Sequence, residues 1–224
     1  MNNQELDTIN NLYKVFSPYT VIGDLSDRSC PCCIDRLDRK ALFSKPLREL
    51  SEDDLGFYMR KAITTLGSVN DYKHFLPRIL ELVALSSEVK DDFIDFEKLN
   101  YGNWLSWKEE EVFAIKLFFT TLLKNALETN SKNMDDYILL NLIYNEDSLS
   151  ETLLESDSER LIQNIIDYAL NIGNNRIDER LANIYSDRRI LDKIEHLFLN
   201  AKNKDEANRI SIAYSILENK NDDA

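Results

Sequence analysis

Glycine and proline are both scarce in this sequence of 224 residues. It contains five glycines and four prolines, whereas average usage of about 12% for the two together would give roughly 27. Tight hairpin turns and phosphate-binding loops depend on these two residue types. The shortage therefore argues against β-sandwiches, β-barrels and glycine-rich nucleotide sites, and it favours a fold made of helices.

The sequence also lacks a long apolar run. Its most apolar stretch, residues 112–127, is interrupted by two lysines, two threonines and an asparagine, so it is too polar to span a bilayer. The first residues have neither the basic start nor the apolar segment of a secretory signal. We therefore expect a cytoplasmic protein without a membrane partner.

Basic residues are outnumbered by acidic ones, 27 to 40, which gives a net charge of −13. Residues 1–112 carry 14 basic and 20 acidic residues, and residues 113–224 carry 13 and 20, so the acidic excess is spread over the chain. Such a field repels phosphate backbones and argues against a nucleic-acid partner. It favours a basic protein as partner, although evenly spread negative charge also serves solubility.

Apolar residues recur at helical spacing along most of the chain, which predicts an all-α fold. The pattern predicts helices at residues 6–16, 52–66, 71–86, 134–144 and 148–154, and at residues 112–127, which are apolar nearly all round. A helix of that last kind is expected to lie buried at the centre of the fold.

Several residues predict where these helices begin or break. Ser51 stands before three acids and should cap the helix that follows. Ser106 and Glu109 have the spacing of a capping box for the long apolar helix. Pro77 should either kink its helix or begin a new one.

Residues 17–50 are the least regular part of the sequence. They contain three of the four prolines and all three cysteines, and they predict only one short helix at about residues 34–43. Since loops often carry function in helical proteins, a site is to be sought here first.

Residues 157–218 contain an internal repeat with a period of 29 residues. Eight residues among 28 aligned pairs are identical, including Ile165 with Ile194 and Asn171 with Asn200. Each copy has the pattern of a two-helix hairpin, residues 159–172 with 177–185 and residues 187–200 with 205–217. Because one hairpin cannot bury its own apolar face, stacked copies predict a solenoid-like end to a single domain of residues 1–224.

Three segments in the first half of the chain occur in a distinctive order. They are Cys30-Pro31-Cys32-Cys33, then Pro46-Leu47-Arg48-Glu49-Leu50, then His74-Phe75-Leu76-Pro77-Arg78-Ile79-Leu80-Glu81-Leu82. This combination, within residues 28–120, resembles a group of uncharacterised bacterial proteins for which no reaction is established. The resemblance implies an all-helical bacterial protein and says nothing about a substrate.

The cysteines are the sharpest chemical signal in the sequence. An odd number packed into four residues cannot form a disulfide framework. Zinc takes four ligands, often thiolates and imidazoles, so Cys30, Cys32 and Cys33 could supply three and His74 the fourth. Adjacent cysteines bind one tetrahedral ion awkwardly, however, and two separate Cys-x-x-Cys pairs are absent, so cysteines half-buried in an irregular loop are the alternative.

The same cysteines could instead serve a redox role. Cys30 could close a reversible bridge with Cys32 or Cys33, whereas Cys32 and Cys33 would form a strained ring. Arg28 and Arg36 are near enough in sequence to lower the pKa of a thiol.

Two further patterns in the sequence could indicate an enzyme site. Asp91, Asp92 and Asp95 match an aspartate-rich magnesium motif, but no second metal motif or cluster of basic residues accompanies them. His74 and His196 belong to no metal-binding pair, and a cysteine–histidine pair with His74 is the only nucleophilic arrangement left. The sequence therefore favours a helical binding protein, with a basic protein as its expected partner, over an enzyme. A zinc or thiol-redox site is the alternative function.

Overall fold

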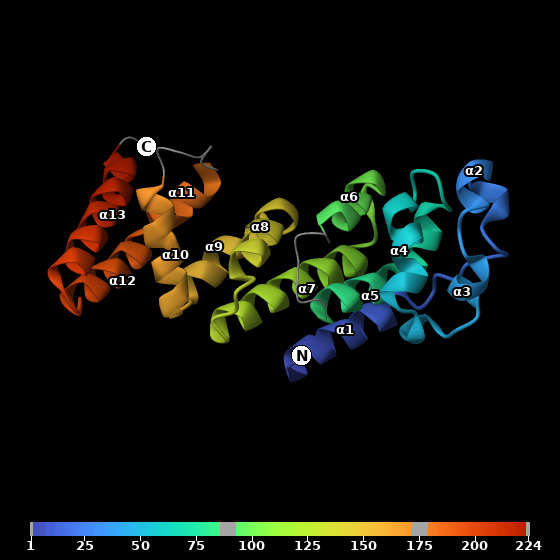
Figure 1. The fold of residues 1–224 in the computed structure, drawn as a ribbon, viewed down its shortest axis with the longest axis horizontal. Helices are drawn as coiled ribbons and strands as arrows, with labels where there is room; N and C mark the ends of the chain where they lie inside the picture. Colours follow the sequence, from blue (N-terminus) through green and yellow to red (C-terminus); the bar gives the residue numbers. More distant parts are fainter. Residues whose placement is uncertain (1, 86–92, 172–178, 223–224) are drawn as a thin grey trace. The chain divides into compact units, whose positions relative to one another are not determined.

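The computed structural model of the chain describes residues 2–85, 93–171 and 179–222. These residues form helices and short connections, and the one β feature among them is an isolated bridge between Ala62 and Leu66 (Figure 1). The all-α fold class is therefore confirmed. None of the helices described is both long and apolar enough to cross a bilayer.

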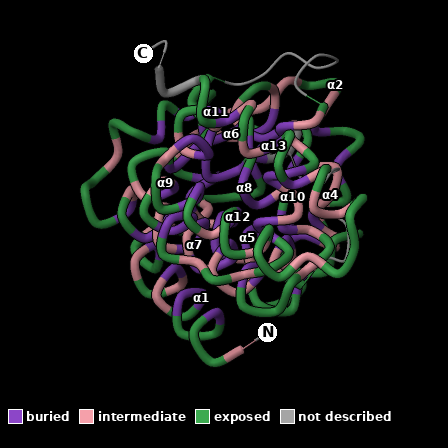
Figure 2. The backbone as a smooth tube through the Cα atoms, turned by 90° about the vertical axis from the view of Figure 1, so that its left-hand side faces the viewer, coloured by how far each residue is buried: buried purple, intermediate pink, exposed green. Residues whose placement is uncertain are grey.

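The chain divides into two compact units, Met1–Leu122 and Leu123–Ala224. The expectation of a single domain stays a prediction. Along the helices of both units, buried positions alternate with exposed ones, as the change between purple and green in Figure 2 shows. This alternation is the amphipathic pattern that the sequence spacing predicts.

The first unit contains six helices of its own among its described residues and most of a seventh. They are α1 (Asn3–Phe16), α2 (Pro31–Ile34), α3 (Arg39–Phe43), α4 (Glu52–Lys61), α5 (Val69–Leu85), α6 (Phe93–Tyr101) and the first part of α7 (Glu109–Glu128). Single 3₁₀ turns occur at η1 (Ser26–Arg28), η2 (Leu47–Glu49) and η4 (Trp104–Ser106).

Helix α5 lies at the centre of this unit, because α1, α4 and η2 all pack against it. Its buried side chains include Phe75, Leu76 and Ile79, none of which is more than 1% exposed. Pro77 lies inside α5, which continues unbroken to Leu85, so it does not begin a new helix. The stabilisation that α5 gains by packing against its neighbours outweighs the loss of the one backbone hydrogen bond that proline removes.

Helix α7 is buried on one face and exposed on another. Ile115, Phe118 and Phe119 are at most 1% exposed, whereas Phe113 is 62% exposed. The prediction of a central helix that is buried nearly all round is therefore only partly met.

The helix starts show which capping predictions were right. Ser51 accepts from the backbone N–H of Asp54 and begins α4, as predicted. The predicted capping box at Ser106 is wrong: that residue ends η4, and its hydroxyl donates to the carbonyl of Asn103. Helix α7 begins at Glu109, and Glu111 accepts from the backbone N–H of Lys108 instead.

Residues 17–50 are irregular, as predicted, but hold more short turns than expected. In place of one helix at residues 34–43, the structure has α2 and α3 with η1 and η2 on either side. The leucines Leu25, Leu37, Leu42 and Leu50 are buried and hold this segment against the unit.

The second unit contains α8 (Met134–Tyr144), α9 (Glu146–Glu155), α10 (Glu159–Leu170), α11 (Glu179–Tyr185), α12 (Arg188–Leu199) and α13 (Lys204–Asp222). Helix α8 packs against α9, and α13 packs against α10, α11 and α12. The helices of the two proposed hairpins therefore form where the repeat places them, except that residues 172–178 lie outside the described residues.

Equivalent positions of the two copies have equivalent local structure. Ile165 and Ile194 are both fully buried. Asn171 and Asn200 each end a helix and donate from the side chain to the carbonyl four residues earlier, at 2.7 and 2.8 Å. These likenesses support the repeat without establishing its family.

Candidate functional site

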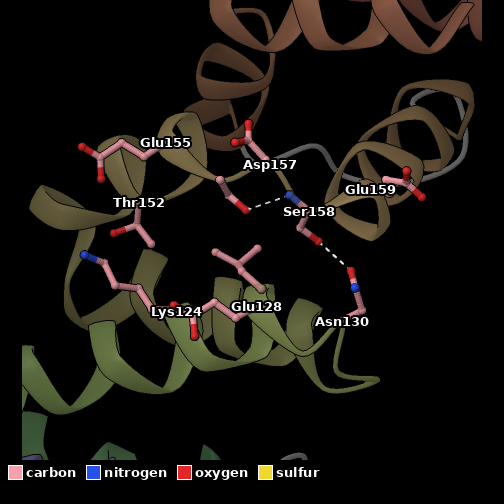
Figure 3. Close-up of a pocket in the computed structure, with 10 residues that line it drawn as sticks. Lys124, Glu128, Asn130, Thr152, Glu155, Asp157, Ser158 and Glu159 are labelled. Carbon is pink, nitrogen blue, oxygen red and sulfur yellow. Dashed lines mark hydrogen bonds between the residues drawn. The ribbon is translucent and has the colours of Figure 1, made fainter. Parts of the chain in front are cut away.

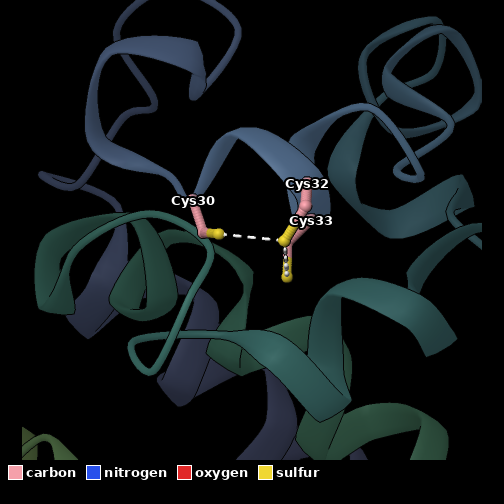
Figure 4. A group of neighbouring side chains, drawn as sticks. All are labelled: Cys30, Cys32 and Cys33. Atoms are coloured by element: carbon pink, nitrogen blue, oxygen red, sulfur yellow. Dashed lines mark hydrogen bonds between the residues drawn. The ribbon is translucent and has the colours of Figure 1, made fainter.

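The three cysteines lie together on the surface of the first unit (Figure 4). Cys30 is the residue before α2, and Cys32 and Cys33 lie in its single turn. The sulfurs of Cys30 and Cys32 are 3.1 Å apart, those of Cys32 and Cys33 are 4.0 Å apart, and all three lie within 4.8 Å of one another. Cys32 is exposed, and the other two are half-buried.

The backbone of this turn is held by hydrogen bonds that the sequence does not reveal. The carbonyl of Cys30 accepts from the N–H groups of Cys33 and Ile34, both at 3.0 Å. The N–H of Cys30 donates to the carbonyl of Thr65 at 2.8 Å. Ile34 is buried and fixes the far end of the turn. The cysteines therefore stand on an anchored turn rather than on a free loop.

The residues before the turn join it to the start of α5. The N–H of Gly67 donates to the hydroxyl of Ser29 at 3.0 Å. Arg28 makes two hydrogen bonds to the carboxylate of Asp71, at 2.6 and 2.7 Å. Asp71 is only 3% exposed, so this ion pair ties the cysteine segment to a buried charge.

The thiols differ in pKa because of their mutual hydrogen bonds. Hydrogen bonds from the thiol of Cys32, and then from the backbone N–H groups of Cys32 and Cys33, lower the pKa of Cys30. The same pairing with Cys30, and then with Cys33, raises the pKa of Cys32 to about 11. The predicted influence of arginine is not seen: Arg28 is engaged by Asp71, and Arg36 lies over the ring of Phe57 at 5.4 Å.

The spacing of the three sulfurs suits a metal ion. Zinc–sulfur bonds of about 2.3 Å place neighbouring sulfurs of a tetrahedral site about 3.8 Å apart. The observed 4.0 Å between Cys32 and Cys33 is close to that value, and the 3.1 Å between Cys30 and Cys32 is shorter. The cluster could therefore hold a metal ion after a small movement of one thiol.

His74, predicted as the fourth ligand, is not part of this group. Its Nδ1 lies 2.9 Å from the carbonyl oxygen of Tyr19, and its ring packs edge-on against Phe75. The structure therefore brings together three of the four predicted ligands. Among the residues that the structure describes, no carboxylate or imidazole joins the three thiols within 4.8 Å.

The remaining candidates do not form a site in the described part of the chain. Asp91 and Asp92, together with the side chain of Asp95, lie outside the described residues. His196 is an exposed residue of α12.

A buried ion pair in the first unit is a feature that sequence reasoning missed. Lys73 donates to Glu111 at 2.6 Å, and their side chains are 8% and 1% exposed. The hydroxyl of Tyr19 also donates to this carboxylate, and the ammonium lies 4.3 Å from the ring of Trp107. Burial first, and then the hydrogen bond to Glu111, raise the pKa of Tyr19 to about 12. Nothing in the local sequence pairs residues 73 and 111, because only the packing of α5 beside the start of α7 brings them together.

The second unit has two hollows beside the link between α9 and α10. One, of about 520 Å³, is shown in Figure 3. The other, of about 730 Å³, has an apolar floor formed by Leu154 and Ile162. Both are lined by Glu155, Asp157 and Glu159.

Comparisons with known proteins give no match. No family model matches the chain, no curated protein is found to be similar, and no solved structure is found to be similar. The resemblance to uncharacterised bacterial proteins therefore stays a prediction.

Proposed function

We propose that the protein binds a thiophilic metal ion through Cys30, Cys32 and Cys33, and that Zn²⁺ is this ion. The observation that carries the proposal is the convergence of three sulfurs within 4.8 Å on one anchored turn. Thiolates are ligands that zinc and other soft ions prefer. The two hydrogen bonds that the Cys30 carbonyl accepts fix the backbone of the turn that carries the thiols.

Three protein ligands leave one tetrahedral position for water or for a group from another molecule. Structural zinc sites are usually closed by four protein ligands, whereas sites that exchange or present the ion keep a position open. The exposure of Cys32 agrees with an open position. We propose a cytoplasmic setting for this function, because free thiols persist in a reducing compartment.

The test is metal analysis of reduced, untagged protein. We expect one zinc ion per chain, and substitution with Co²⁺ should give a thiolate-to-cobalt charge-transfer band. Cys32→Ser should lose stoichiometric metal. His74→Asn, which can keep the hydrogen bond to Tyr19, should bind metal as the wild type does. Reduced protein that takes up no zinc or cobalt would refute the proposal. Loss of metal in His74→Asn would show that His74 is a metal ligand after all.

A second function, binding of a basic protein partner, is favoured by the hollows of the second unit. Glu155, Asp157 and Glu159 line both of them and outnumber the basic side chains there, which are Lys124 in one hollow and Arg189 and Lys193 in the other. Asp157 is 97% exposed and pairs with Lys193 at 3.4 Å. An apolar floor with a rim that carries more acidic than basic side chains is complementary to an apolar side chain flanked by lysine or arginine. The net charge of −13 would steer such a partner toward the protein.

A comparison of variants tests this second function. The double substitution Glu155→Lys and Glu159→Lys reverses charge at both hollows, and Glu179→Lys changes an exposed acid of α11 as a control. A basic protein that is captured by wild type and by Glu179→Lys, in a salt-sensitive way, and lost by the double variant would support it. Equal capture by all three proteins, or capture of nothing above background, would exclude these hollows as the binding surface.

A further inference from the structure

The sulfurs of Cys30 and Cys32 are the closest pair in the cysteine cluster. Their separation of 3.1 Å is about 1 Å longer than a disulfide bond of roughly 2.05 Å. Cys32 is exposed, so a small oxidant can reach the pair from solvent. The two sulfurs need to approach each other by about 1 Å to form the bond.

Cys33 is less well placed to take part. Its sulfur is 4.0 Å from that of Cys32, and a disulfide between adjacent residues closes a strained ring. Its N–H is held by the carbonyl of Cys30 at 3.0 Å, which fixes Cys33 in the helical turn. The sulfurs of Cys30 and Cys33 also lie within 4.8 Å of each other, but the 3.1 Å contact makes Cys30 with Cys32 the pair that has the least distance to close.

We infer that Cys30 and Cys32 form a reversible disulfide by exchange with a low-molecular-weight disulfide, leaving Cys33 as a free thiol. Because the two sulfurs lie 3.1 Å apart, once one of them has formed a mixed disulfide the other is within reach to resolve it. With Cys30 as the attacking group, Cys32 is the resolving group.

The exchange takes place in two balanced steps. The Cys30 thiolate attacks one sulfur of the small disulfide, which breaks its sulfur–sulfur bond, forms a mixed disulfide and releases one thiolate. The thiol of Cys32 then loses its proton to solvent and attacks the Cys30 sulfur, which releases the second small thiolate. The two cysteines together lose two electrons, the small disulfide gains them, and excess small thiol reverses both steps.

The consequence for the metal rests on the proposed function. A disulfide between Cys30 and Cys32 removes two of the three ligands, so oxidation should release a bound zinc ion. A bound ion should in turn protect both thiols from the oxidant. Formation of the disulfide itself needs no metal, so the two ideas can fail separately.

The experiment treats metal-free protein with oxidised glutathione. Free thiols are then blocked with one alkylating reagent, and the remaining cysteines are reduced and labelled with a second. All three cysteines fall in one tryptic peptide, residues 29–36, so fragmentation mass spectrometry can locate each label. We expect two thiols per chain to be lost, a monomer lighter by two hydrogen atoms, and the first label on Cys33 alone.

Two serine variants form a matched pair. Cys33→Ser should oxidise as the wild type does, whereas Cys30→Ser leaves only the adjacent pair and should stay reduced or stop at the mixed disulfide. Three unchanged thiols in the wild type, a first label on Cys30 or Cys32, or a disulfide between two chains would each overturn the inference.

A parallel sample loaded with zinc distinguishes the inference from the proposed function. Release of zinc in step with thiol loss supports both the disulfide and the metal site. Thiol loss in a protein that never bound zinc supports the disulfide and refutes the metal site. Bound zinc with thiols that stay reduced after the metal is chelated refutes the disulfide and leaves the metal site standing.

Discussion

Replacing Lys73 by methionine is expected to destabilise the first unit by about 3 kcal/mol at neutral pH. Lys73 is the only cation in salt-bridge contact with the buried carboxylate of Glu111 among the ion pairs described for the chain, and their side chains are 8% and 1% exposed. Methionine keeps much of the volume and removes the charge, so the main effect is a buried carboxylate without its cation.

The magnitude follows from the remaining contacts. Breaking a buried ion pair by removing one partner costs about 3–5 kcal/mol. The hydroxyl of Tyr19 and the N–H of Lys108 still donate to Glu111 in the variant, so the lower end of this range applies. The contact of the ammonium with Trp107 at 4.3 Å is lost as well.

The pH dependence has a definite sign. Burial by itself raises the pKa of Glu111, but hydrogen bonds from Lys73 and Tyr19 outweigh it and hold this pKa below its usual value. In the wild type, the carboxylate therefore contributes stability above its unfolded-state pKa, and this contribution is lost as the pH falls through the folded-state pKa. Without Lys73, the raising effect of burial dominates, and protonation of Glu111 relieves the penalty. The difference in free energy of unfolding between variant and wild type should therefore become smaller as the solution is acidified.

Urea unfolding followed by tryptophan fluorescence measures this difference. Both tryptophans, Trp104 and Trp107, lie in the first unit, so the signal reports on that unit. Lys40→Met, at an exposed lysine, is the control and should stay within about 0.5 kcal/mol of wild type. A loss below about 1 kcal/mol for Lys73→Met at pH 7, or a difference that grows on acidification, would refute the reasoning.

Substitutions at four other residues should have defined effects on stability. Gly67→Ala should cost about 1–3 kcal/mol in thermal unfolding, because Gly67 has a φ of +66° and a Cβ there would lie 3.2 Å from Asp71; an unchanged melting temperature would contradict the strain. Ile165→Ala and Ile194→Ala remove fully buried side chains at equivalent positions, so each should cost about 2–5 kcal/mol by circular dichroism, and a cost below 1 kcal/mol for either would argue against equivalent packing in the two hairpins. Ser51→Ala removes the cap of α4 and should cost about 1 kcal/mol in urea unfolding, while Ser51→Thr, which can still cap, should recover most of it.

Much of the fold could be predicted because it depends on short-range rules. Apolar spacing located most of the helices, and Ser51 was recognised as a cap from three following residues. The prediction at Ser106 failed although its spacing was equally good. There Ser106 belongs to a 3₁₀ turn, and Glu111 forms an ion pair with Lys73. Helix α7 therefore begins at Glu109.

One part of the candidate site could be predicted from the sequence, and another part could not. The closeness of Cys30, Cys32 and Cys33 follows from their adjacency in sequence, since residues in one helical turn lie near one another. The assignment of His74 as a ligand required a contact with cysteines more than forty residues away. The position of a side chain relative to such distant residues depends on how the helices pack. Its imidazole is held by the carbonyl of Tyr19 instead.

The sequence by itself determined that this protein is built of helices, where most of them lie, and that its thiols are gathered in one short segment. Only the tertiary structure decided how the cysteine turn is anchored, which ligands it lacks, and that Lys73 meets Glu111 in the core of the first unit. Local order depends on residues within about four positions, which the sequence displays directly. Contacts between distant residues depend on how whole helices pack, and no short pattern encodes that.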